Sequence, residues 1–187
     1  KPKGEVIPKT AEEFAALLNS HLSEIDDGYD DAILGNAMEK LEFECFSDNV
    51  ENSLTKNVVG MGAIPKYVGD RLNSFKSEYE KLYALIRNCN LVIHEMKETD
   101  TEMAKACYAT AYTLRGVAYY NLMRLFCGTF NKQKADEQLG LSIVTRFDME
   151  ARPKRSSLQE VVSLIEEDLK KGISYNSQSE IYRYTVD

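Results

Sequence analysis

The chain has 187 residues, of which 43% are hydrophobic, so it is long enough to build one domain with a substantial core. It carries 23 basic and 30 acidic side chains, for a formal net charge of -7. This acidic balance argues against a nucleic-acid binder, because such proteins need basic patches to displace counterions from phosphates. No apolar run approaches the ~20 residues that span a bilayer. The polar start at Lys1 has no initiator Met and no secretory signal, so we interpret the chain as a trimmed form whose targeting segment has been removed.

Residues 11–25 show the pattern of a helix with one buried face. Thr10 and Glu13 form a capping-box pair at its start, and the turn-forming residues 26–28 end it. His21 lies on the apolar stripe, and we interpret it as a histidine at the edge of the core, because no ligand partner lies one turn away on the same face. The stripe itself comprises Phe14, Leu17, Leu18, Leu22 and Ile25.

Residues 26–73 are less regular. A short helix is expected at about 30–46, and the segment 60–65 has a density of Gly and Pro that breaks helices and makes turns. Long loops in compact domains are usually functional or disordered. This region is therefore the first place to look for a binding site.

Two long helices are predicted at about 74–97 and 101–127. Apolar residues recur every three or four positions in the first, and the second is apolar nearly all round, which is typical of a helix buried by several neighbours. Thr99 and Glu102 predict a capping box between them, and Gly128 predicts the end of the second helix. Because the link is only a few residues long, the two helices must pack antiparallel.

The chain after Gly128 contains a second loop region, 128–155, and then a fourth helix. Residues 139–144 form a short apolar run that is expected to be extended, whereas the basic run 152–155 is expected to be a solvated loop. Ser157 and Glu160 form a third capping box, which predicts a helix at 157–171 that Gly172 closes.

Three polar residues, Asn90, Arg115 and Asn121, lie within the apolar helices. They either contact a ligand or form a buried hydrogen-bonded lock between helices, and we favour the lock. A buried arginine needs a partner, and Asp168 and Glu167 on the fourth helix are the candidates.

The four cysteines, Cys45, Cys89, Cys107 and Cys127, show no CxxC spacing and no zinc-like spacing with histidine. We favour buried free thiols, because free cysteine behaves as a small hydrophobic residue. A Cys89–Cys107 bridge is the alternative if the two helices face each other.

The helix pairs also carry family-like motifs. Tyr112, Arg115, Gly116 and Tyr119 occupy spacings typical of a tetratricopeptide repeat. A more specific set is formed by three segments in order: 83–90 (YALIRNCN), 111–122 (AYTLRGVAYYNL) and 152–169. The residues that define these motifs are Tyr83, Asn90, Leu114, Arg115 and Asp168. Over about 74–170 the chain thereby resembles the SusD-like (RagB/SusD) proteins, with Gly116 in place of the usual Ala and no Val-Pro-Leu at 129–131.

This resemblance implies an all-α fold, a tetratricopeptide-like antiparallel helical scaffold with long irregular loops. It implies that residues 1–187 form the N-terminal helical region of a longer protein. Such proteins are lipid-anchored at the cell surface, on the outer membrane of Bacteroidetes, where they cap a SusC-like TonB-dependent transporter and bind glycans, or sometimes peptides, for import. The membrane contact would come only from a lipid anchor upstream of this chain.

The resemblance also places part of a sugar site in the loop before the 83–90 helix, and the rest in a C-terminal half outside this chain. Sugar binders stack pyranose faces on aromatic rings and bind the hydroxyl rim with polar side chains. The chain has no Trp, so the best candidate ring is Tyr67. The candidate ligand-binding residues are Asp48, Asn49, Tyr67, Arg71 and Asn73.

The sequence shows no catalytic constellation, so we predict that the protein is not an enzyme and uses no metal or cofactor. His94-Glu95 lacks the second histidine of a zinc protease, 60–62 is a bare GxG, and 26–31 lacks EF-hand spacing. A generic tetratricopeptide-type protein–protein adaptor is the alternative to a glycan binder. An upstream signal peptide that ends in a lipidated cysteine would distinguish the two.

Overall fold

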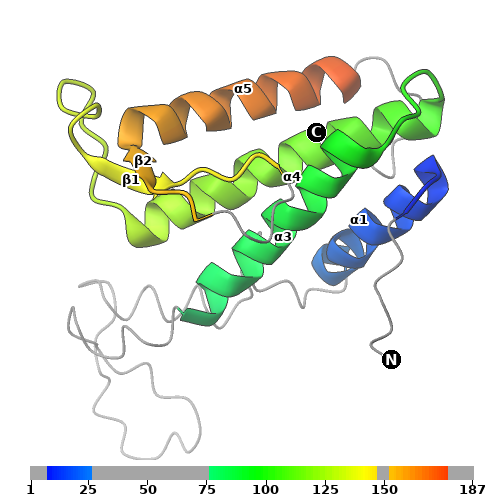
Figure 1. The fold of residues 1–187 in the computed structure, drawn as a ribbon, viewed down its shortest axis with the longest axis horizontal. Coiled ribbons are helices and arrows are strands. Elements are labelled where there is room, and N and C mark those ends of the chain that lie inside the picture. Colours follow the sequence, from blue (N-terminus) through cyan, green and yellow to red (C-terminus); the bar gives the residue numbers. More distant parts are fainter. Residues whose placement is uncertain (1–7, 27–75, 147–151, 177–187) are drawn as a thin grey trace, which may run out of the picture.

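The computed structural model describes residues 8–26, 76–146 and 152–176. Within these ranges the elements follow in the order α1 (Ala11–Asp26), α3 (Lys76–Glu95), α4 (Glu102–Phe126), β1 (Leu139–Ser142), β2 (Arg155–Ser157) and α5 (Leu158–Asn176) (Figure 1). Helices dominate, and the strands form one short antiparallel ribbon. The predicted all-α class is therefore confirmed.

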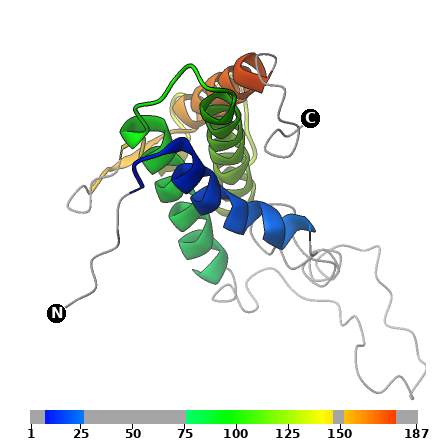
Figure 2. The same cartoon turned by 90° about the vertical axis from the view of Figure 1, so that its right-hand side faces the viewer.

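Helix α4 is the centre of the scaffold. It packs between α3 and α5, and the six-residue link between α3 and α4 makes these two helices antiparallel, as predicted (Figure 1). Helix α1 lies across α3 and α4 on the side away from α5 (Figure 2). Consistent with this position, α4 is buried around most of its circumference between residues 104 and 122.

The core joins all four helices. Burying a large apolar side chain completely contributes about 1.5–3 kcal/mol, and each helix supplies at least one. The most deeply buried large apolar side chains are Phe14, Leu18, Leu82, Leu85, Ile86, Val92, Leu114, Tyr119, Leu122, Leu158 and Val161. The predicted stripe of α1 is thus confirmed at Phe14 and Leu18.

The start of α5 is as predicted, whereas the start of α4 is not. Ser157 N donates to Glu160 Oε2 (2.7 Å) and Glu160 N donates to Ser157 Oγ (3.2 Å), which is a reciprocal capping box. At α4 the prediction of Thr99 is wrong. Thr101 is the N-cap, because its extended backbone lets its hydroxyl accept a hydrogen bond from Ala104 N at 3.2 Å.

Gly172 does not close the fourth helix, because α5 continues to Asn176. Its role is packing: a Cβ atom at position 172 would collide with Thr113 Oγ1 and lie 3.3 Å from the carbonyl oxygen of Ala109. Gly116 has the same role, because a Cβ there would lie 3.2 Å from the Leu169 side chain. These two glycines allow α4 and α5 to approach closely.

The extended run predicted at 139–144 is confirmed over 139–142 as β1, but its partner β2 was not predicted. The strands pair Leu139 with Ser157 and Ser142 with Arg155. Arg155 was expected in a solvated loop, and instead its Nε donates to the carbonyl oxygen of Gly140 at 2.6 Å. The second strand of the ribbon thus begins at Arg155, the last residue of the basic run, and 152–154 belong to no strand. The helix predicted at 30–46 lies outside the described residues.

Candidate functional site

The five candidate ligand-binding residues, Asp48, Asn49, Tyr67, Arg71 and Asn73, lie outside the described residues. They remain predictions. The described part of the chain begins again at Lys76, the first residue of α3. It contains two features that bear on function: a buried polar cluster at the middle of α4 and a surface hollow at its C-terminal end.

The buried cluster joins the three long helices through Arg115. Its Nε and Nη2 donate to the two carboxylate oxygens of Asp168 on α5, at 2.7 and 2.8 Å, and its Nη1 donates to Asn90 Oδ1 on α3 at 2.7 Å. Asp168 is therefore the partner, and Glu167 instead pairs with Lys171 on the surface. The bidentate arrangement is the strong form of this ion pair.

Arg115 remains charged in this setting. Burial lowers the pKa of its guanidinium, but the hydrogen bonds and negative charge of Asp168 outweigh burial, so the net pKa of Arg115 is raised. The ring of Tyr112 lies 5.5 Å from the guanidinium carbon and covers one face of it. An enclosed charged group of this kind agrees with the interpretation of Arg115 as part of a hydrogen-bonded lock between helices.

The cluster also fixes the chain that follows β1. Asn90 Nδ2 donates to the carbonyl oxygen of Val144 at 2.9 Å, and Val144 N donates to the hydroxyl of Tyr119 at 2.7 Å. Tyr83 on α3 donates its hydroxyl proton to the carbonyl oxygen of Ser142 at 2.8 Å. Burial raises the pKa of Tyr119 to about 12 and raises that of Tyr83 as well, which moves deprotonation of both hydroxyls to higher pH.

The described cysteines are free thiols, so the alternative of a Cys89–Cys107 bridge is wrong. Burial raises the pKa of Cys89 and of Cys107 to about 12. A thiol of this kind is a poor nucleophile, because the reactive species is the thiolate. His21 lies at the edge of the core, as expected, where its Nε2 is 3.0 Å from Asn88 Nδ2.

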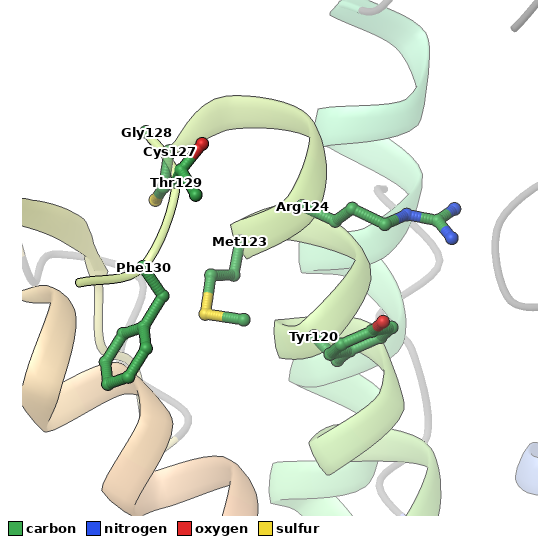
Figure 3. Close-up of a pocket in the computed structure, with 7 residues that line it drawn as sticks. All are labelled: Tyr120, Met123, Arg124, Cys127, Gly128, Thr129 and Phe130. Atoms are coloured by element: carbon green, nitrogen blue, oxygen red, sulfur yellow. The ribbon is translucent and has the colours of Figure 1, made fainter. Parts of the chain in front are cut away.

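The hollow has a volume of about 280 Å³ and lies where α4 ends. Helix α4 stops at Phe126 and Cys127 is extended, which turns the chain back past the last helical turns. Figure 3 shows the Met123 side chain between the rings of Phe130 and Tyr120, with Gly128 and Thr129 above it. The lining residues are Tyr120, Met123, Arg124, Cys127, Gly128, Thr129 and Phe130.

Two aromatic rings of this hollow face solvent. Tyr120 is 47% exposed and Phe130 is 39% exposed. The guanidinium carbon of Arg124 lies 6.0 Å from the centre of the Tyr120 ring. Next to the hollow, Tyr79 in α3 contacts Phe126 edge-to-face, with ring centres 5.2 Å apart. The hollow therefore lies at the same end of α4 as this aromatic contact with α3.

The sequence prediction missed this hollow. It described the second long helix as apolar nearly all round and assigned no role to Tyr120 or Phe130. The available signal was the spacing of Tyr120, Met123, Arg124 and Cys127, which puts all four on one face of a helix just before it ends. The ring of Phe130 joins them only because of the turn after Phe126, which the spacing does not reveal.

Fold and cluster together define an antiparallel helical scaffold whose polar core residues join consecutive helices. Residues 5–185 match the SusD-like family model, which is described as starch-binding and associating with the outer membrane. Because this match spans nearly the whole chain, the protein belongs to the SusD-like family. None of the curated proteins matches the chain.

Solved structures show the same fold. The chain is similar to a candidate sugar-binding protein of Bacteroides vulgatus, with 19% identity over 91% of this chain and 38% of that one, and a TM-score of 0.61. It is also similar to a SusD superfamily protein of Bacteroides thetaiotaomicron, with 20% identity over 89% of this chain and 37% of that one, and a TM-score of 0.60. The chain thus spans little more than a third of the length of these proteins.

Two further findings concern only the described residues. No helix among them is long and apolar enough to cross a bilayer. Their His, Cys, Asp and Glu side chains form no group of three or more that could hold a metal ion.

Proposed function

We propose that this protein is a non-enzymatic, cell-surface glycan-binding component that acts with a SusC-like TonB-dependent transporter. The observation that carries the proposal is the family match over residues 5–185. In this proposal the chain is the N-terminal helical region of a longer protein, a lipid anchor upstream holds it to the outer membrane, and the ligand is an oligo- or polysaccharide.

The structure supports separate roles for the helical scaffold and for the loops of the protein. The helices are joined by a buried charged cluster in which Arg115 donates hydrogen bonds to Asp168 and Asn90. A buried polar network with satisfied hydrogen bonds makes a scaffold rigid. Scaffolds of this kind present their ligand-binding residues on loops. We therefore retain Asp48, Asn49, Tyr67, Arg71 and Asn73 as the proposed ligand-binding residues, with Tyr67 as the ring on which a sugar stacks.

A generic protein–protein adaptor has less support. Tetratricopeptide-like helices alone fit either function, but the polar residues Asn90, Arg115 and Asp168 form one hydrogen-bonded unit that matches the SusD-like motifs. The solved structure of a candidate sugar-binding protein that shares this fold points the same way.

Affinity electrophoresis of the full-length protein tests the proposal. The gels contain amylopectin, arabinoxylan, pectic galactan or yeast mannan, and retardation in at least one gel is expected. Tyr67→Ala should weaken retention about tenfold, which corresponds to about 1.4 kcal/mol for one stacked ring. Ile173→Ala removes an exposed apolar side chain on α5 and serves as the control, with no change expected.

Absence of retardation in every gel would contradict glycan binding. The partner is tested separately by affinity purification of the tagged protein from solubilised outer membranes. A TonB-dependent transporter is expected to copurify, and its absence would contradict that part of the proposal alone.

A further inference from the structure

Exposed aromatic side chains are concentrated at one end of the scaffold. Within the described ranges, the large apolar side chains that are more than a third exposed are Tyr79, Tyr120, Phe130, Leu139 and Ile173. Two of these five line the hollow at the end of α4, and Tyr79 contacts Phe126 beside it. Exposed apolar residues scattered singly need no explanation, but a group around one concave site indicates binding.

The lining of the hollow has mixed chemistry. The rings of Tyr120 and Phe130 offer flat apolar surfaces and Thr129 supplies a hydroxyl, while the guanidinium of Arg124 extends past Tyr120, away from Phe130 (Figure 3). A pyranose has the complementary distribution, with an apolar face of C–H groups and a rim of hydroxyls. A groove for an amphipathic helix would instead need a row of apolar anchors at helical spacing along its length.

The size of the hollow also favours a small group. Its volume of about 280 Å³ is at the lower limit of the roughly 300–1,000 Å³ of ligand pockets. It is large enough for a sugar ring of a longer chain, whose remaining rings extend into solvent. Met123 between the two aromatic rings gives the floor an adaptable surface (Figure 3).

The position of the hollow links it to the proposed ligand-binding loop. Helix α3 is the element that directly follows residues 47–73 in the sequence, and Tyr79 near its start contacts Phe126 in the last turn of α4, with ring centres 5.2 Å apart. The hollow is therefore at the end of the scaffold where α3 begins.

We propose that this hollow is a second sugar subsite, which binds one ring of the same polysaccharide that the 47–73 loop contacts. The inference rests on the proposed glycan-binding function and adds to it a subsite on the scaffold, built from Tyr120, Phe130 and Thr129.

Three variants of the full-length protein test this subsite. Tyr120→Ala and Phe130→Ala each remove one wall, and Gly128→Leu fills the hollow from its rim. A Cβ atom at position 128 meets nothing within 4 Å, so the new side chain leaves the backbone into open space. The matched controls are Leu139→Ala and Ile173→Ala, which shorten exposed apolar side chains outside the hollow.

The readout is retention by the polysaccharide that retards the wild-type protein most in the four gels. Each hollow variant should weaken retention about three- to tenfold, as expected for the loss of one aromatic contact, while the controls bind like the wild type. Melting temperatures should match the wild type within the error of the measurement, which confirms that the effect is local.

The outcomes separate the two proposals. Wild-type retention together with undiminished retention of all three hollow variants would overturn the subsite and leave glycan binding in place. No retention of the wild type in any gel would overturn both. Normal glycan retention of the hollow variants combined with loss of the copurifying transporter would overturn the sugar subsite in favour of a protein contact.

Discussion

Tyr119 and Tyr120 are neighbours in the sequence, yet they lie on two different faces of α4. Tyr119 is fully buried and bonds to the backbone of Val144, whereas Tyr120 is 47% exposed beside the hollow. In the buried part, polar groups are paired with one another and hold helices together. At the exposed end, aromatic rings are left uncovered. The comparison teaches that one helix serves as scaffold on its buried face and presents exposed aromatic rings on another face near its end.

The largest expected effect is in the buried part. Arg115→Met should destabilise the fold by about 3–5 kcal/mol, because it leaves the buried carboxylate of Asp168 without its partner. Urea denaturation measures this loss, and glycan selectivity should not change. Lys170→Met is the control, since it breaks only an exposed ion pair with Glu166 and should cost less than about 0.5 kcal/mol.

An unchanged melting temperature of Arg115→Met would refute the lock. The double variant Arg115→Met/Asp168→Leu sharpens the test, because replacing both charges with apolar groups should recover much of the loss.

The two neighbouring tyrosines give a smaller and more direct contrast. Tyr119→Phe removes the hydroxyl that accepts the Val144 N–H and should cost about 1–2 kcal/mol, because that N–H loses its partner. Tyr120→Phe removes an exposed hydroxyl and should change stability by less than about 0.5 kcal/mol. Chemical denaturation of the pair measures the difference, and equal losses in both variants would contradict the contrast.

A last contrast, of similar size, distinguishes two glycines. Gly172→Ala should destabilise by about 1–2 kcal/mol, because the new methyl group collides with Thr113 and this cost exceeds the gain in helix propensity. Gly128→Ala lies at the open rim of the hollow and should be nearly neutral. Thermal unfolding compares the two, and adding Thr113→Ala to Gly172→Ala should restore part of the stability. A neutral Gly172→Ala would show that α5 can move away from α4.

The sequence was sufficient to predict the elements whose signals are local. Periodicity located the four helices, and the reciprocal pair of Ser157 and Glu160 fixed the start of α5. The sequence was insufficient where the role of a residue depends on a partner that is far away along the chain. Gly172 looks like a helix end until α4 is known to lie against it. Arg155 looks solvated until β1 offers it a carbonyl oxygen.

The same distinction applies to function. The polar motif predicted the partner of Arg115, because a buried charge requires an opposite one and Asp168 was one of two candidates. The hollow was not predicted, because the exposure of Tyr120 and the position of Phe130 depend on the turn after Phe126. The predicted ligand-binding residues between 48 and 73 lie outside the described residues and stay predictions.

Val144 makes backbone hydrogen bonds that have a consequence for the order of folding. Its N–H and carbonyl groups are bonded by Tyr119 and Asn90, which are 25 and 54 positions away in the sequence, and Asn90 is itself bonded by Arg115. Contacts of such separation form only after the loop-closure entropy has been overcome. Docking of this segment is therefore expected to be a late event, and hydrogen-exchange protection of the single Val144 amide should report when the segment has docked on α4.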